Sequence, residues 1–278
     1  MSALLFSLLV LALSAVAGFL GSLTGLGGGV LIVPALAIAL GVNIKYAIGA
    51  SLVSVIATSS GSAAAYVREG FSNIRIGMLL EIATTLGAVG GAILAAHIST
   101  HAIAIVFGLV LLQAAYHSLF AKHETVAIVN SDALGAKLRL GGDYPVDGKR
   151  QPYGVRHVPA GFGLMCGAGV LSGLLGIGSG AVKVIAMDRV MKIPFKVSTT
   201  TSNFMIGVTA AASAGVYLSR GYIEPRVAMP VMLGVLAGAF LGTKVLVHAR
   251  VRTLRVIFGV VVLALAIEII VNGITGKV

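Results

Sequence analysis

Residues 18–29 read Gly-Phe-Leu-Gly-Ser-Leu-Thr-Gly-Leu-Gly-Gly-Gly, and residues 169–180 read Gly-Val-Leu-Ser-Gly-Leu-Leu-Gly-Ile-Gly-Ser-Gly. The second stretch repeats the glycine pattern of the first at an offset of 151 residues. The same offset pairs further identical residues without a gap: Lys45 with Lys196, Ser51 with Ser202, Thr58 with Thr209, Tyr66 with Tyr217, Arg75 with Arg226 and His97 with His248. Duplication of a unit of about 110 residues is the simplest explanation.

The composition places this duplicated unit in a membrane. Hydrophobic residues make up 58% of the chain and charged residues only 10%, whereas a soluble domain carries about 25% charged residues. Several apolar runs reach about 18 residues, enough to cross about 30 Å of hydrocarbon. The sequence therefore predicts an all-α polytopic membrane protein in a lipid bilayer. We expect it in the cell's inner (plasma) membrane.

The net charge of +11 does not indicate nucleic-acid binding, because the basic residues are scattered through short loops. The single cysteine, Cys166, has no second cysteine with which to form a disulfide. Residues 1–17 resemble a secretory signal peptide, but they lack a basic n-region, and the chain from Leu13 onward matches the second repeat from Leu164. We expect the segment to be retained.

Each repeat is predicted to combine a broken, re-entrant helical element with three membrane helices. The apolar stretches 3–40 and 159–190 are too long for one span, and their glycine clusters are poor helix interiors. The helices that follow are expected at 44–67, 74–97 and 101–120, and at 195–218, 225–247 and 253–272. The domains are a first membrane repeat (1–120), a cytoplasmic linker (121–158) and a second membrane repeat (159–278).

The loop charges favour repeats of inverted orientation. If each broken element enters and leaves on the same side, three crossings follow, and short-loop residues such as Arg68, Arg189 and Lys192 lie in the cytoplasm, as the positive-inside rule requires. Repeats of parallel orientation would move most of these charges outside. The polar, proline-containing linker is interpreted as a solvent-exposed tether rather than a binding module.

The two glycine clusters are the candidate binding site. Broken helices in inverted repeats are a transporter architecture, in which substrate binds where the breaks meet near the middle of the membrane. Exposed backbone N–H groups, and a helix that begins just after them, favour an anion. The candidate ligands are Gly27, Gly28, Gly29, Gly178, Ser179 and Gly180. The alternative is that the glycines only permit close packing.

The motif Gly25-Leu-Gly-Gly-Gly29 with Pro34, followed by Lys45 and Ala47-Ile-Gly-Ala-Ser51, resembles the TauE/SafE sulfite exporter family. The second copy, from Gly176 through Lys196 to Thr199-Thr-Thr-Ser-Asn203, resembles that family's second half. The resemblance covers nearly the whole chain outside the linker. It implies a secondary transporter of sulfur-containing anions such as sulfite, thiosulfate or organosulfonates. Ser179 replaces the middle glycine of the first copy, so the second break is expected to be shaped differently.

Lys183 is the charged residue most expected in the site. It follows Gly180 by three residues, where the first copy has Ile32. A lysine at membrane depth is costly unless it is solvated or paired. Its ammonium could reach back to the N–H groups of the second break, where a bound anion would offset its charge. The competing partner is a carboxylate, and Glu81 of the other repeat could supply it.

Small hydroxylated and amide side chains are expected to line the pathway. Ser51 and Ser202 are related by the repeat, and Thr201 and Asn203 lie beside Ser202 in the second copy. Their donors can replace the water shell of an oxyanion. Helix–helix packing, where small polar residues are also common, explains them equally well.

The sequence contains no His/Cys cluster with metal-ligand spacing and no nucleophile–base motif, so we expect no metal, no cofactor and no catalytic residue. We expect a secondary transporter, by resemblance an exporter, that binds a small sulfur-containing anion and works by alternating access. A non-transporting membrane scaffold and an anion channel are the alternatives. The oligomeric state stays open, and a homo-oligomer is compatible with the sequence.

Overall fold

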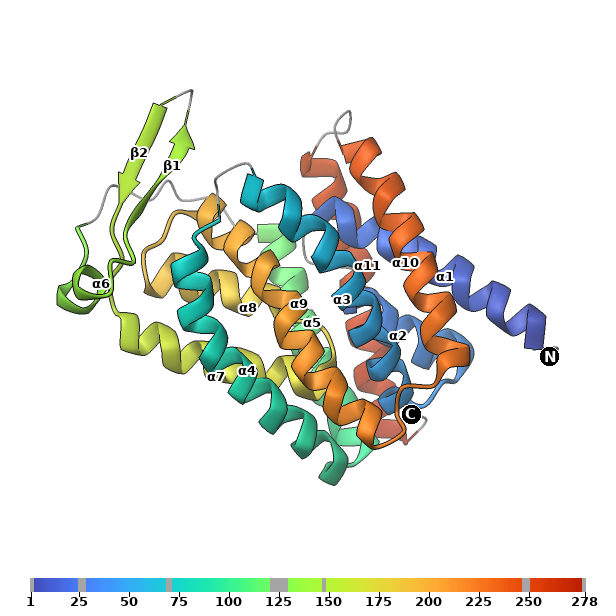
Figure 1. Cartoon of the computed structure of the whole chain (residues 1–278). Coiled ribbons are helices and arrows are strands. Elements are labelled where there is room, and N and C mark those ends of the chain that lie inside the picture. The colour runs from blue at the N-terminus through green and yellow to red at the C-terminus, as the bar shows by residue number, and fades with distance from the viewer. Residues whose placement is uncertain are drawn as a thin grey trace.

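The computed structural model describes residues 3–24, 29–68, 72–120, 130–146, 149–246 and 251–276. The first repeat contains α1 (Ala3–Thr24), α2 (Gly29–Leu40), α3 (Ile44–Arg68), α4 (Ile74–His97) and α5 (Thr100–Phe120). The second contains α7 (Val158–Leu175), α8 (Gly180–Ile185), the π-helix η1 (Ala186–Val190), α9 (Phe195–Ser219), α10 (Pro225–Leu246) and α11 (Val251–Thr275). Between them lie α6 (Ala133–Lys137) and the strands β1 (Gly142–Val146) and β2 (Lys149–Tyr153), as Figure 1 shows.

The prediction of an all-α polytopic membrane protein is confirmed. Among the described residues, five helices are long and apolar enough to cross a membrane: Leu4–Gly21, Ile74–His97, Val158–Leu175, Pro225–Gly242 and Phe258–Thr275. Large apolar side chains face outward on these helices, and Leu4 and Ile274 are each 71% exposed. Apolar surface on this scale suits contact with lipid tails rather than water.

The helices repeat at the offset read from the sequence. α2, α3, α4 and α5 begin at residues 29, 44, 74 and 100, and α8, α9, α10 and α11 begin at residues 180, 195, 225 and 251. Each pair of starts differs by the same 151 residues. The duplicated sequence therefore folds into two copies of one helical unit.

The two copies exchange their first helices, since α1 packs along α10 and α7 packs along α4. Glycines permit the close approach. A Cβ at Gly87 of α4 would collide with the carbonyl of Cys166 in α7, and one at Gly238 of α10 would collide with the carbonyl of Ala15 in α1. The members of these two contacts are related by the 151-residue offset. The same helix–helix contact is therefore made twice, which is the pattern that two-fold symmetry between the copies produces.

Helices α5 and α11 pack against each other in opposite directions. Gly259, early in α11, lies against Leu119 at the end of α5, whereas Gly273, late in α11, lies against Ala104 near the start of α5. Antiparallel packing of two repeat-related helices is what inverted repeats produce. The orientation of the repeats in the membrane stays a prediction.

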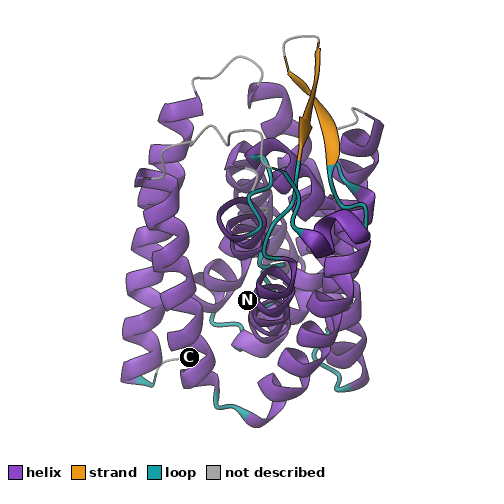
Figure 2. Cartoon of the chain, turned by 90° about the vertical axis from the view of Figure 1, so that its left-hand side faces the viewer, coloured by secondary structure: helices purple, strands orange, loops and turns teal. Residues whose placement is uncertain are grey.

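The described part of the linker is folded and docked. β1 and β2 pair antiparallel in a hairpin that projects from one end of the helical bundle (Figure 2). Leu140 and Tyr153 are buried in an apolar cluster with Met191, which follows η1. Asn73, the cap of α4, donates its side-chain amide to the Leu140 carbonyl at 2.9 Å and to the Tyr153 hydroxyl at 2.7 Å. The segment therefore holds on to both repeats, which a plain tether does not.

Candidate functional site

The second helix break is built by three residues with left-handed backbones. Gly176 and Gly178 have φ of +68°, and Ser179 has φ of +46°. Glycine adopts this conformation freely, whereas serine does so at a cost, so Ser179 stores strain between α7 and α8. Ser179 is 3% exposed, and its hydroxyl has no hydrogen-bond partner among the described residues. A strained residue with a buried, unpaired donor suggests a functional site.

Ser51 of α3 joins the start of α2 to the second break. It is fully buried, and its hydroxyl donates to the carbonyl oxygen of Gly176 at 2.9 Å and lies 3.4 Å from the carbonyl oxygen of Gly29, the first residue of α2. In the second repeat, Ser202 of α9 donates to the carbonyl of Gly180 at 3.3 Å. Ser51 and Ser202 thus make the same contact with the helix that follows each break. The structure brings these predicted residues into one buried cluster.

The other predicted ligands of α8 and α9 are placed differently. Gly178 belongs to the cluster, because it lies with Gly180 against Ile206 of α9. Thr201 lies outside it, since its hydroxyl accepts a hydrogen bond from the backbone N–H of Asn73 at 3.0 Å. Asn203 is partly buried, and no side-chain contact among the described residues places it in the cluster. Gly27 and Gly28 lie outside the described residues.

Lys183 is fully buried, at 0% exposure, one turn into α8. Its ammonium donates to the Thr209 hydroxyl of α9 at 2.6 Å, and that hydroxyl donates to Glu81 Oε1 of α4 at 2.7 Å. Glu81 is itself only 8% exposed. The ammonium therefore points toward α4 and α9 rather than back to the N–H groups of the second break. The carboxylate considered as its competing partner, Glu81, is linked to it through the Thr209 hydroxyl.

The Lys183–Thr209–Glu81 chain links the two repeats, because Glu81 belongs to the first and the other two residues to the second. The Thr85 hydroxyl also donates to Glu81 Oε1, at 3.2 Å. Glu81 Oε2 is buried and has no hydrogen-bond partner in the described part of the chain. Buried charges are tolerated only when they are paired and hydrogen-bonded, so this carboxylate is incompletely satisfied.

The first repeat has no equivalent of this charge pair. A shift of 151 residues places Ile32 at the position of Lys183 and Met232 at the position of Glu81. Thr58, the equivalent of Thr209, donates to the Ser54 carbonyl of its own helix at 3.0 Å. The contact between the repeats is therefore built once with this charge pair and once without it, so packing of the repeats does not require the charges. Their presence suggests a task at the interface of the repeats.

Sequence reasoning did not place Thr209 or Thr85 in the site. The sequence shows only that Thr209 is the repeat equivalent of Thr58, and this does not indicate its hydrogen-bond partners. Thr85 follows Glu81 by four residues, so the two share one face of α4. If Glu81 is assumed to be buried, that spacing predicts Thr85 as a hydrogen-bond partner of its carboxylate.

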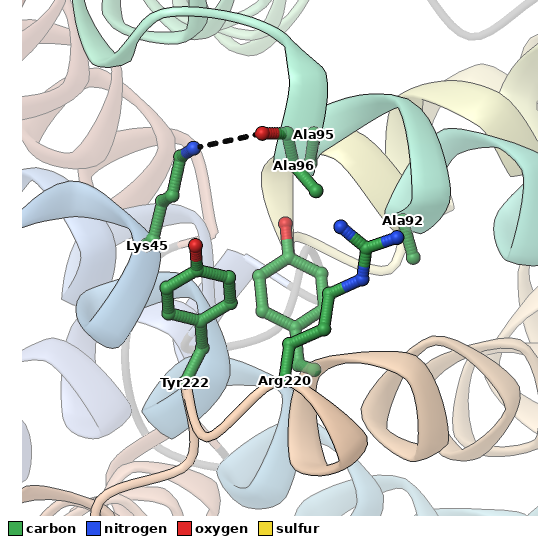
Figure 3. Close-up of a pocket in the computed structure, with 7 residues that line it drawn as sticks. Lys45, Ala92, Ala95, Ala96, Arg220 and Tyr222 are labelled. Carbon is green, nitrogen blue, oxygen red and sulfur yellow. Dashed lines mark hydrogen bonds between the residues drawn. The ribbon is translucent and has the colours of Figure 1, made fainter.

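A small pocket lies near the ends of α3, α4 and α9 and is lined by Lys45, Ala92, Ala95, Ala96, Tyr217, Arg220 and Tyr222 (Figure 3). Two of these residues are basic and none is acidic. The ammonium of Lys45 lies 5.7 Å from the ring centre of Tyr222. The buried hydroxyl of Tyr217 donates to the carbonyl of Leu174 at 3.3 Å, two residues before Gly176. Tyr217 therefore contacts both the pocket and the end of α7.

Sequence comparison matches residues 10–269 to the family described as "Sulfite exporter TauE/SafE". The Bacillus subtilis (strain 168) protein YunE, named a probable membrane transporter protein, is 25% identical over 96% of this chain and 98% of its own length. YdhB of the same organism, with the same description, is 26% identical over 87% and 89%. A probable membrane transporter protein of Xylella fastidiosa (strain 9a5c) is 26% identical over 91% and 90%. No solved structure gives a significant match.

Proposed function

Because this chain belongs to the sulfite exporter TauE/SafE family and is a multi-pass membrane transporter, we propose that it exports sulfur-containing anions such as sulfite, thiosulfate or organosulfonates across the plasma (inner) membrane. The description of the family supports the substrate class, and the names of the relatives support transport. Transport needs no chemical step, so no residue receives a catalytic role.

The fully buried ammonium of Lys183 is the observation that carries the proposal. A buried cation next to a helix break can attract an anion, which its repeat partner, Ile32, cannot do. A charge-assisted hydrogen bond from an ammonium to an oxyanion is roughly twice as strong as a neutral one. Lys183 therefore provides the main attraction in the proposed site.

Hydroxyl groups near the breaks would complete the coordination of the anion. The unpaired hydroxyl of Ser179 can donate without giving up a bond within the described residues. Ser51 and Ser202 can turn their hydroxyls from backbone carbonyls to the anion. Each oxygen of a sulfite or sulfonate accepts such donors, so these three serines can replace part of its water shell.

The position of the site between the repeats supports alternating access. Ser51 and Glu81 belong to the first repeat, and Ser179 and Lys183 belong to the second. A rocking motion of one repeat against the other would therefore change the access to the site from one side of the membrane to the other. Substrate would be held between the two breaks during the motion.

Transport by purified protein in liposomes tests the proposal. We expect saturable uptake of labelled sulfite, thiosulfate or methanesulfonate, and exchange of the trapped anion for external anion. Gly178→Ala should abolish transport, because its φ of +68° strains any side chain and a Cβ would lie 2.8 Å from Ile206. Gly163→Ala is the matched control, since a Cβ at Gly163 has nothing within 4 Å.

The same experiment separates the two rival functions. An anion channel would show flux that does not saturate and no exchange of trapped anion. A membrane scaffold would move none of the three anions, and its phenotype in cells would depend on the linker instead. Removal of residues 130–157 should then abolish the cellular phenotype.

A further inference from the structure

The buried chain formed by Lys183, Thr209 and Glu81 contains one positive and one negative group. Lys183 and Glu81 are 0% and 8% exposed, and the Thr209 hydroxyl lies between them at 2.6 Å and 2.7 Å. Leu80 and Met205, which neighbour Glu81 and Thr209, are fully buried and apolar. Charges in such surroundings are weakly screened, so their sum must stay near zero.

An anion that binds to Lys183 disturbs this balance. A monovalent anion adds a second negative charge next to a single ammonium, and the site then carries a net charge of −1. The effective penalty for an unpaired buried ion is several kcal/mol. Uptake of one proton by the Glu81 carboxylate from the water on the side that faces the site returns the sum to zero.

The unpartnered oxygen of Glu81 is suited to this proton. Oε1 accepts from Thr209 and Thr85, whereas Oε2 accepts from no described residue. A proton on Oε2 leaves both existing hydrogen bonds in place. The protonated carboxyl then holds Thr209 without attracting Lys183, so the ammonium is released toward the anion.

Few other groups could compete for this proton. From its own helix, Glu81 faces Thr84 and Thr85, and from α8 it faces Lys183. Helix α7, which packs along α4, contains no Asp, Glu, Lys, Arg or His between Val158 and Leu175, and its thiol, Cys166, is exposed. The titratable residues of α9 are Lys196 and Tyr217, eight or more residues from Thr209. Glu81 is thus the acid that faces the site in the described residues.

We propose that Glu81 is the proton carrier of this transporter, and that one proton crosses with each anion in the same direction. The inference rests on the proposed function, because it needs an anion at Lys183. For a monovalent anion the proton and the anion cancel, so the loaded site crosses with no net charge. The proton leaves Glu81 when the anion is released, and the Lys183–Thr209–Glu81 chain then closes again.

Methanesulfonate tests the inference, because it stays monovalent at every accessible pH. In proteoliposomes, wild-type protein should accumulate it about tenfold for each pH unit of an imposed gradient, since one pH unit corresponds to a tenfold ratio. An interior clamped positive or negative with potassium and valinomycin should leave the accumulation unchanged. A trapped pH indicator should report one proton for each labelled anion.

Glu81→Gln is the decisive variant. Glutamine resembles the protonated acid and still accepts from Thr209, so exchange of internal for external methanesulfonate should continue. Accumulation driven by the pH gradient should fall from about tenfold to none, because no proton can be carried. Glu224→Gln is the control, since Glu224 is exposed before α10 and should keep wild-type coupling.

The outcomes separate the inference from the proposed function. If wild-type protein exchanges no anion, the proposed function fails. If it exchanges methanesulfonate but the pH gradient still drives accumulation in Glu81→Gln, or if folded Glu81→Gln loses exchange as well, Glu81 is not the proton carrier. If Glu81→Gln does not fold, the wild-type data decide alone, and accumulation that follows voltage rather than pH overturns the inference.

Discussion

Ser51 and Ser202 occupy equivalent positions but differ in what they hold. Ser51 bonds to the second break as well as to α2, whereas Ser202 bonds to the Gly180 carbonyl alone. Ser51→Ala should therefore lower the free energy of unfolding by about 1 kcal/mol, and Ser202→Ala by less. Thermal unfolding in detergent measures the difference. Equal loss in both variants would mean that Ser51 does not join the start of α2 to the second break.

Lys183 should respond to substitution as an anion ligand with a nearby carboxylate. Lys183→Arg keeps the charge and should retain some binding, Lys183→Gln should raise the apparent KM severalfold, and Lys183→Glu should abolish transport. Because Lys183→Gln leaves Glu81 without its cation, adding Glu81→Gln should restore the stability of the variant. Transport kinetics and thermal unfolding measure the two effects.

The control for the lysine series is Lys192→Gln, since Lys192 is exposed after η1. This variant removes the same charge outside the breaks and should keep the wild-type KM. An unchanged KM in Lys183→Gln would show that the residue is not an anion ligand. In that case the ammonium would serve only to hold the repeats together.

The structure brings several of the predicted residues into one cluster, but the sequence did not predict their partners. Lys183 was identified because a charge after a glycine break is unusual at membrane depth. Its contact with Glu81 could not be read locally, because Thr209 and Glu81 are 128 residues apart and belong to different repeats. Thr201 looked equivalent to Ser202, but its position around α9 directs it to Asn73. Residues that are adjacent in the sequence of a helix point in different directions and contact different partners, which composition does not reveal.

At the scale of elements, close helix packing should depend on particular glycines of α4. A Cβ at Gly87 would collide with the carbonyl of Cys166, whereas a Cβ at Gly90 has nothing within 4 Å. Gly87→Ala should lower stability by about 1–3 kcal/mol through overpacking. Gly90→Ala should raise it slightly, because alanine is the better helix former. Matching thermal midpoints for the two variants would contradict the packing of α4 on α7.

The linker should loosen in acid through Asp132, the cap of α6. The backbone N–H of Gly135 donates to its carboxylate at 2.7 Å, and this bond holds the pKa of Asp132 below its usual value. A lowered pKa in the folded state means that the contribution to stability is present above the ordinary pKa and is lost as pH falls through the lowered one. Amide hydrogen exchange of residues 130–157 should therefore rise only below about pH 4.

Two substitutions check this assignment at neutral pH. Asp132→Asn should raise the exchange of residues 130–157 at pH 7 and remove its dependence on acid, because the amide cannot titrate. Asp143→Asn breaks the exposed ion pair with Arg150, which is 3.0 Å long, and should have little effect. Equal exchange in both variants would mean that the Asp132 cap does not hold the linker.

The elements themselves were well predicted where they are apolar and poorly where they are polar. The expected helix at 74–97 coincides with α4, and the starts of α3 and α9 were also predicted. Long apolar runs bounded by polar residues leave little freedom in where a membrane helix lies. The hairpin was missed, because β1 and β2 are five residues each and are stabilised by docking against Met191 rather than by their own pattern.

At the scale of the whole molecule, the direction of the two-fold axis decides how the two repeats are oriented in the membrane. A two-fold relation between the repeats is compatible with an axis along the membrane normal or in the membrane plane. An axis along the normal would make repeat-related helices parallel, but α5 and α11 run in opposite directions, as Gly259 and Gly273 show. The axis therefore lies across these helices, and if both span the bilayer the repeats are inverted.

Cysteine labelling tests this orientation directly. Arg75 and Arg226 are equivalent residues at the starts of α4 and α10, and both are exposed. In a Cys166→Ala background, Arg75→Cys and Arg226→Cys should react with a membrane-impermeant maleimide from opposite sides of the membrane. Arg150→Cys in the hairpin should react from the same side as Arg75→Cys, because Arg75 donates to the Arg139 carbonyl of the docked linker at 3.4 Å. Labelling of both repeat positions from one side would mean that the repeats are parallel, and it would overturn the inverted orientation.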